Sequence, residues 1–187
     1  MPTVFIVVAV IAVILVLWAI SAYNSLVRKK NYITEAWSGI DNQLKRKVNI
    51  ITNLVDSIKM QTKFESDVID KIAASRAGML SQDKEKAMAA SDEVTRVMPS
   101  VVALAESYPQ LGTNQSYLKL MADIKDVEDK VTYARTRYNV CVTDYNNTIA
   151  IFPKSIIAGM FRFGPEKVFE IAAEERIDAD NLRISEL

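Results

Sequence analysis

Residues 4–20 read VFIVVAVIAVILVLWAI, a run of seventeen consecutive apolar side chains. A helix of about twenty residues rises roughly 30 Å, which matches the hydrocarbon core of a bilayer. Core helices of soluble proteins are rarely apolar on every face over this length. A cleavable signal peptide needs a basic start, whereas residues 1–3 carry no charged side chain. It also needs small residues before the cleavage site, whereas Ile20 occupies position −3 of the plausible site after Ala22. We therefore expect an uncleaved transmembrane anchor over residues 1–27.

The charges that flank this span predict its orientation. Every acidic and basic side chain lies at or after Arg28, and Lys29 and Lys30 follow directly. The positive-inside rule then places the C-terminal domain in the cytoplasm and the N-terminus outside. Trp18 and Tyr23 are expected at the lipid headgroups, where amphipathic rings are favoured. The predicted membrane-interface residues are Trp18, Tyr23, Arg28, Lys29 and Lys30.

The chain after the span has the pattern of a helix that buries one face. No proline occurs between Pro2 and Pro99, and a helix continuing unbroken from the anchor would reach Ala77. Apolar residues recur at spacings of three and four, which is the periodicity of an amphipathic helix. They are Ile33, Trp37, Ile40, Leu44, Val48, Ile51, Val55 and Ile58, followed more weakly by Ile69 and Ile72.

Two further helices are predicted. The first runs from about Lys84 to Tyr108 after cap-type residues at 81–83, and Pro99 should kink or divide it. The second runs from Gln115 to about Ile151 after the candidate N-cap Asn114. The sequence thus predicts an all-α fold in which an N-terminal transmembrane helix precedes an antiparallel bundle of three to four long helices. The bundle is expected over residues 28–163, and an acidic tail over residues 164–187.

Composition excludes several functional classes. Lys and Arg number 23, Asp and Glu number 23, and histidine is absent. A neutral chain is not a typical nucleic-acid binder, and Ser-His-Asp triads and histidine-based metal sites need the missing residue. The single cysteine, Cys141, allows no intrachain disulfide and is expected to be a small buried hydrophobe. We expect no enzymatic activity, no metal, no cofactor and no nucleic-acid partner.

Polar residues within the pattern divide into two kinds. Glu128 and Arg135 interrupt an apolar stripe, so we expect each to be buried and paired, the alternative being a ligand site. Residues 45–47 (KRK) are expected to form a solvated face. Residues 28–60 carry seven basic against three acidic side chains, an excess suited to anionic lipid, and residues 166–187 carry seven acidic against three basic. This acidic end should either fold back on the basic face or stay disordered.

An ordered series of motifs across the chain resembles the LemA family. YNSLVR occupies residues 23–28, EAW 35–37, QLKRK 43–47, IITNLV 50–55, ESYPQL 106–111, YN 138–139 and FP 152–153, and residues 156–163 are similar to the family's C-terminal end. The motif residues are Tyr23, Asn24, Trp37, Asp41, Arg46, Asn53, Leu54, Glu65, Glu106, Tyr108, Pro109, Glu128, Arg135, Tyr138, Asn139, Phe152 and Pro153. Two positions depart from the family pattern: Thr52 replaces a proline, and Phe64 replaces a histidine before Glu65.

The resemblance implies a helical protein of the bacterial cytoplasmic (inner) membrane, single-pass and without enzymatic activity. Members of the family are similar to proteins linked with membrane remodelling, including a magnetosome membrane protein, and often accompany membrane metalloproteases or TPM-domain proteins. Two functions fit this description. One is a self-assembling scaffold that organises or remodels the membrane, and the other is a tethered adaptor that docks a protein partner such as a membrane protease.

Self-assembly is expected to use the part of the first stripe closest to the membrane. Ile33, Trp37 and Ile40 follow the span at helical spacing. An exposed apolar surface at this place would mark an interaction site, and tryptophan is favoured in interface hot spots. We therefore expect a homo-oligomer with an interface at Ile33, Trp37 and Ile40, the alternative being that Trp37 packs inside its own bundle.

Overall fold

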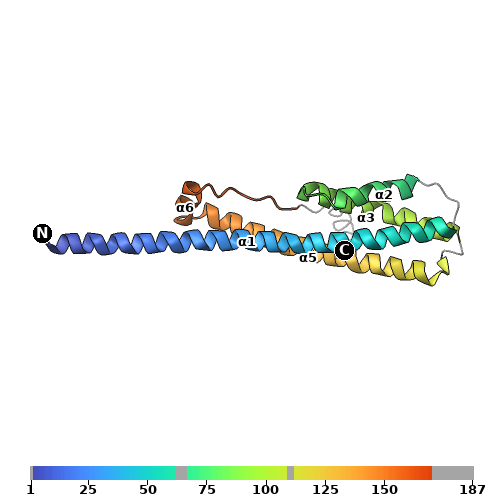
Figure 1. The fold of residues 1–187 in the computed structure, drawn as a ribbon, viewed down its shortest axis with the longest axis horizontal. Helices are drawn as coiled ribbons and strands as arrows, with labels where there is room; N and C mark the ends of the chain where they lie inside the picture. The colour runs from blue at the N-terminus through green and yellow to red at the C-terminus, as the bar shows by residue number, and fades with distance from the viewer. Residues whose placement is uncertain (1, 62–66, 109–111, 170–187) are drawn as a thin grey trace, which may run out of the picture. The chain divides into compact units, whose positions relative to one another are not determined.

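A computed structural model describes residues 2–61, 67–108 and 112–169 (Figure 1). All regular elements in these ranges are helices, which confirms the all-α prediction. They are α1 (Pro2–Gln61), α2 (Asp67–Met79), α3 (Lys84–Ser107), α5 (Gln115–Ala150) and α6 (Lys154–Met160). Whether the helix from the span continues unbroken to Ala77, which the sequence leaves open, depends on residues 62–66, which lie outside the described residues. Residues 170–187, which make up most of the acidic tail, also lie outside them.

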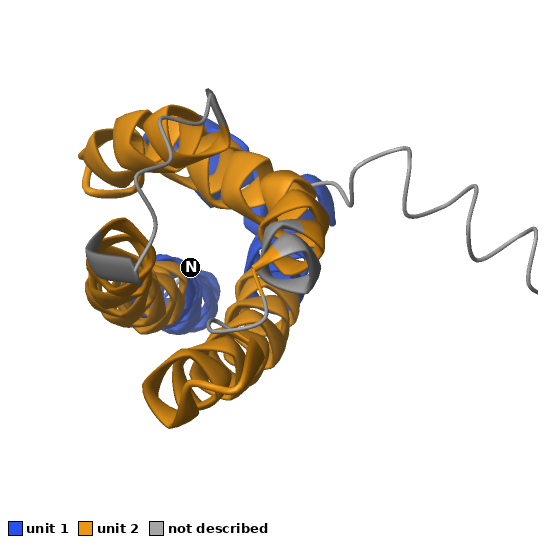
Figure 2. Cartoon of the chain, turned by 90° about the vertical axis from the view of Figure 1, so that its right-hand side faces the viewer, with its two compact units in different colours: residues 1–31, 139–187 blue, residues 32–138 orange. Residues whose placement is uncertain are grey.

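The chain divides into two compact units (Figure 2). Unit 1 comprises Met1–Asn31 and Asn139–Leu187, and unit 2 comprises Tyr32–Tyr138. Both α1 and α5 therefore contribute residues to each unit.

The core of unit 2 is formed by one apolar face from each of its helical segments. α1 contributes the stripe predicted from sequence, with Leu44, Ile51 and Ile58 at 0% exposure. α5 contributes Ile124 and Val127, which are also buried. Further core side chains come from α2 and α3: Ile69, Ile72, Met79, Val94 and Val101. The spacings of three and four in the sequence therefore identified the buried face of α1 correctly.

Close packing of α2 against α3 depends on Gly78. A Cβ atom at this position would lie 2.6 Å from the Cβ of Ala90, closer than two carbon atoms approach without displacement. Glycine therefore lets the end of α2 lie against α3. By contrast, a Cβ atom at Gly39 in α1 would meet no atom within 4 Å.

The helix starts expected from sequence are present. Oδ1 of Asp83 accepts hydrogen bonds from the backbone amides of Glu85 and Lys86 at 2.9 and 3.2 Å, which caps α3. Oδ1 of Asn114 accepts from Ser116 and Tyr117 at 2.8 and 3.1 Å and caps α5. Pro99 lies inside α3, which runs on to Ser107, so the proline does not divide the helix.

In unit 1, α6 packs on the N-terminal part of α1. Ile157 and Ala158 are buried against Ala22 and Leu26, and Ala19 packs beside them. The Phe163 amide donates to the Ala158 carbonyl at 2.9 Å and closes the C-terminus of the helix in a Schellman motif.

Candidate functional site

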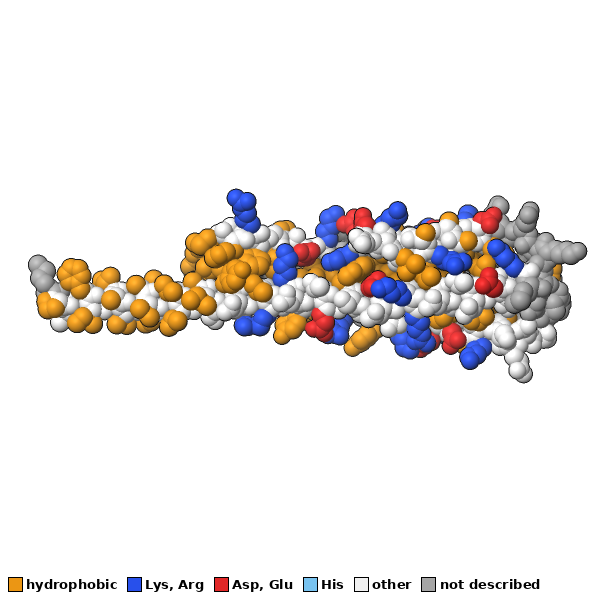
Figure 3. Space-filling view, in the orientation of Figure 1, with side chains coloured by type: hydrophobic (Ala, Val, Ile, Leu, Met, Phe, Trp, Pro, Cys, Tyr) orange, Lys and Arg blue, Asp and Glu red, His pale blue; other side chains and the backbone are white. Residues whose placement is uncertain are grey.

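The apolar span forms the first part of α1 and is exposed on all sides. Within the described residues, one helix is long and apolar enough to cross a membrane, and none of its most apolar window is buried. Phe5 and Leu17 are 74% and 62% exposed. On the face drawn in Figure 3, hydrophobic side chains cover this part of α1 and continue over the region of α6. The exposed surface is the kind that a bilayer would cover.

The predicted membrane-interface residues lie where the span ends. Tyr23 stacks against Phe161 with ring centroids 4.7 Å apart and meets Phe163 at 5.8 Å. Lys29 forms an ion pair with Asp144, and the Lys30 ammonium lies 3.9 Å from a carboxylate oxygen of Glu166. Trp18 and Arg28 are both exposed. The sequence did not reveal that Phe161 and Phe163, which follow α6, also lie at the end of the span.

Arg162 ends α6 in an unusual backbone conformation. Its φ is +58°, in the left-handed region where helix ends usually place glycine. A residue with a Cβ atom adopts this conformation at a cost of about 1 kcal/mol. The chain therefore keeps an arginine where glycine would be more stable.

Two asparagines of α5 hold the segment after α6 by its backbone. The Asn146 amide donates to the Glu166 carbonyl at 2.8 Å and accepts from the Glu166 N–H at 3.0 Å. Asn139 makes the same pair of bonds with Phe169, at 2.7 and 2.8 Å. The Tyr145 hydroxyl donates to the Gly164 carbonyl at 3.0 Å. The start of the acidic end thus folds back, and the motif residue Asn139 is one of its two clamps.

A buried polar cluster links three helices of unit 2. The Lys47 ammonium lies 2.7 Å from Oε1 of Glu128 and donates to the carbonyl and hydroxyl oxygens of Ser91, each at 2.8 Å. Its side chain is 0% exposed. Thr95 donates to Glu128 at 2.8 Å. The expectation of a solvated face is therefore wrong for Lys47, although Lys45 and Arg46 are exposed.

The second polar residue of the α5 stripe is also paired. Arg135 forms an ion pair with Asp92 of α3, and the arginine side chain is 13% exposed. Both Glu128 and Arg135 thus have charged partners, as expected, although the two side chains are half-buried and not fully buried. Burial lowers the pKa of Lys47, and the charge of Glu128 opposes that shift. In unit 1, burial raises the pKa of Tyr145, and the nearby Glu166 raises it further.

The exposed apolar patch expected next to the span is absent. Ile33 and Ile40 are 2% and 0% exposed, because the chain itself covers them. Trp37 is half-buried and packs edge-to-face on Tyr138 at 6.2 Å, with the Lys84 ammonium 5.6 Å from its ring centroid. The premise for an oligomer contact at these residues is wrong, and Trp37 packs inside its own unit. The spacing of apolar residues shows that one face of the helix is buried, but it does not show whether the same chain or a second chain covers that face.

Most of the remaining motif residues either pack in the core or form ion pairs at the surface. Leu54 and Tyr138 are buried, Tyr108 packs beside the core of unit 2, and Asp41 and Arg46 pair with Lys45 and Asp126 at 2.6 and 3.0 Å. Asn24, Asn53, Phe152 and Pro153 are exposed. Glu65 and Pro109 lie outside the described residues, as does Phe64, and Glu106 lies in α3. Thr52 continues α1 without a break and donates to the Val48 carbonyl at 2.7 Å.

No constellation for metal chemistry is visible in the part of the chain that the structure describes. Within it, no group of three or more Cys, Asp and Glu side chains is placed to hold a metal ion. Cys141 is half-buried in α5.

Comparison with known proteins agrees with the motif series. A family model described as the LemA family matches residues 36–181. No curated protein matches the chain.

Proposed function

Because this chain belongs to the LemA family and carries an exposed apolar span, we propose that it is a membrane-anchored, self-assembling helical scaffold that organises or remodels the bacterial membrane. Family membership and the apolar helix fit a membrane-associated helical protein. The observation that carries the proposal is the composition of α1. This one helix holds both the exposed span and the apolar face around which the core of unit 2 packs. The proposed role requires no catalysis, cofactor or nucleic acid.

We place unit 2 in the cytoplasm, at the inner membrane. Arg28, Lys29 and Lys30 support this orientation because they follow the span directly. Two more basic residues, Lys154 and Arg162, belong to the segment that packs on the end of the span in unit 1. A C-terminal reporter active only in the periplasm should give no signal. A strong signal would reverse the orientation.

Self-assembly is proposed to occur within the bilayer, through the span. The span is apolar on every face, and none of its most apolar window is buried, so this part of the helix is accessible to another copy. Ile33 and Ile40 are not available for this contact because their own chain covers them. The test is chemical cross-linking in intact membranes, using Val13→Cys in a Cys141→Ser background. Disulfide-linked dimers are expected, and their absence across a series of cysteines along the span would contradict the proposal.

A tethered adaptor is the alternative function. An adaptor would remain monomeric or dimeric in the membrane and would need a protein partner, such as a membrane protease, to form a larger complex. Because one cysteine in each chain links at most two copies, the mass of the full-length protein without that partner separates the two functions.

A further inference from the structure

The segment around α6 carries an exposed apolar surface that the scaffold proposal does not use. We call it the α6 surface. Its five large side chains lie within eleven residues and are between 53% and 75% exposed: Ile151, Phe152, Ile156, Met160 and Phe161. Single exposed apolar residues are common on proteins, whereas a contiguous group usually marks an interaction site. The α6 surface therefore calls for a partner.

Its position in unit 1 identifies the kind of partner. The opposite side of α6 is buried against Ala22 and Leu26 of α1, with Ala19 packed beside them. Ala19 belongs to the apolar span itself. The Lys154 ammonium donates to the Ser25 hydroxyl at 3.4 Å, which fixes the start of α6 to the same turns of α1. The α6 surface thus lies at the height where the span ends and the charged part of the helix begins.

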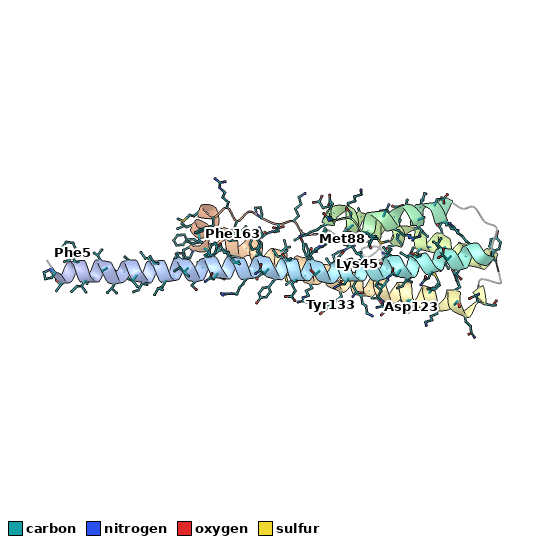
Figure 4. All side chains as sticks on the ribbon, viewed as in Figure 1. Phe5, Lys45, Met88, Asp123, Tyr133 and Phe163 are labelled. Carbon is teal, nitrogen blue, oxygen red and sulfur yellow. The ribbon has the colours of Figure 1, made fainter. Side chains whose placement is uncertain are left out.

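We propose that the α6 surface is a second membrane-contacting element, which enters the interfacial region of the same bilayer that the span crosses. The proposal rests on the membrane anchor of the preceding section. Lipid that surrounds Ala19 and Tyr23 is also adjacent to the side chains packed on them, and the rings of Phe161 and Phe163 both contact the ring of Tyr23. Figure 4 labels Phe163 beside α6. Short apolar faces with basic neighbours are typical of segments that lie in the membrane interface.

Charge at the α6 surface fits lipid headgroups. Lys154 begins α6, and Arg162 follows its last turn. Arg28, Lys29 and Lys30 follow the end of the span, although Lys29 pairs with Asp144 and the Lys30 ammonium lies 3.9 Å from a carboxylate oxygen of Glu166. Anionic headgroups attract basic side chains at the end of a span. Arg162 holds a left-handed backbone conformation, which costs more for arginine than for glycine. A contact of its guanidinium with lipid phosphate would offset that cost.

A bilayer explains the α6 surface better than a second copy of the chain does. Its apolar side chains adjoin the span, so a lipid environment reaches both surfaces without a gap. A protein partner would have to displace that lipid at the same height. We therefore assign lipid as the partner of the α6 surface. The experiment below also detects contact with a second copy of the chain.

Spin labels on the full-length protein test the proposal directly. In a Cys141→Ser background, a nitroxide is attached at Met160→Cys and the protein is reconstituted into mixed phosphatidylcholine–phosphatidylglycerol vesicles. Collision with oxygen reports a lipid environment, and collision with a water-soluble nickel chelate reports water. The matched controls are Val13→Cys in the span and Thr143→Cys, an exposed position of α5. The Met160 and Val13 labels should both collide more with oxygen than the Thr143 label, and less with nickel.

The other outcomes are distinct. If Val13 is lipid-exposed while Met160 matches Thr143, the anchor stands and the second contact is overturned. If Val13 is water-exposed, the membrane anchor itself is overturned, and this proposal with it. Spin–spin broadening at Met160 that disappears on dilution with unlabelled protein, without oxygen accessibility, would assign the surface to a second copy and overturn the lipid contact.

A second variant separates charge from folding. Arg162→Gly removes the guanidinium and suits the left-handed backbone, so the turn should keep its structure. The nickel accessibility of the Met160 label should then become less sensitive to the phosphatidylglycerol content of the vesicles, whereas Arg162→Lys should keep the sensitivity of the parent. Equal sensitivity in all three proteins would overturn the assignment of Arg162 to lipid phosphate.

Discussion

Lys47 of α1 and Glu128 of α5 form an ion pair of 2.7 Å in which the lysine side chain is 0% exposed. The pair joins the two helices in unit 2, and Ser91 of α3 accepts two further hydrogen bonds from the same ammonium. Removing one partner from a buried pair leaves a charge without compensation, which costs more than the pair itself contributes. The pair therefore favours one packing arrangement of these helices, and substitution of either Lys47 or Glu128 alone should be destabilising.

Substitution of Glu128 should be severe, and double substitution should be mild. Glu128→Leu leaves the Lys47 ammonium without its counter-charge and should lower the free energy of unfolding by about 3–5 kcal/mol. Lys47→Met combined with Glu128→Leu should recover most of that loss. The control is Asp41→Leu, since the exposed Asp41–Lys45 pair should change stability by less than about 1 kcal/mol. Urea unfolding of the detergent-solubilised protein measures all three, and a double variant no better than Glu128→Leu would contradict the account.

Stability should rise with pH in the alkaline range because of Lys47. Burial holds its pKa below the ordinary value of 10.5. Between the lowered pKa and 10.5, the unfolded chain binds more protons than the folded chain, so the free energy of unfolding increases with pH. Below the lowered pKa, the lysine is charged in both states and the penalty is fully present. Lys47→Met should flatten this slope in chemical unfolding measured across alkaline pH, and an unchanged slope would exclude Lys47 as its source.

The buried faces were predictable because they depend on periodicity alone. Spacings of three and four fix which side of a helix is apolar, as for Leu44, Ile51 and Ile58. Lys47 was not predictable, since its burial depends on Ser91 and Glu128, which are distant in sequence. A signal was present in the neighbouring stripe, because a glutamate inside an apolar face needs a basic partner and Glu128 therefore implied one. The sequence did not specify which lysine supplies it.

Gly39 and Gly78 of unit 2 should respond oppositely to substitution by alanine. Gly78→Ala places a Cβ atom against Ala90 and should destabilise the protein by about 1–3 kcal/mol, as overpacking does. Gly39→Ala meets open space inside α1 and should stabilise by about 0.5–1 kcal/mol, because alanine loses less backbone entropy in a helix. Thermal unfolding of both variants is the measurement. A destabilising Gly39→Ala would show that this face of α1 is not open.

The asparagine clamps should control the start of the acidic end. Asn146→Ala removes both hydrogen bonds to the backbone of Glu166, so the amide of Glu166 should exchange with solvent faster. Asn139→Ala should do the same at Phe169. Asn147→Ala is the matched control, because Asn147 is exposed on the same helix. Hydrogen exchange read by mass spectrometry decides, and equal exchange in all three variants would contradict the clamp.

The sequence predicted that the acidic end could fold back, but it did not predict that Asn139 and Asn146 would bind it. It left open whether the acidic end folds back, because charge complementarity alone does not choose a contact. The structure shows that the segment up to Phe169 is held through its backbone, which any sequence can offer. The recognition therefore resides in Asn139 and Asn146, seven residues apart on α5, and their spacing gives no signal before the segment they bind is known.

The central claim is that the chain assembles with itself in the membrane. Its most direct test is the mass of the full-length protein, purified in mild detergent without partners and measured by mass photometry at controlled concentration. A scaffold should give regular particles that contain many copies. A protein that remains monomeric at micromolar concentration would contradict the scaffold and leave the tethered adaptor as the function.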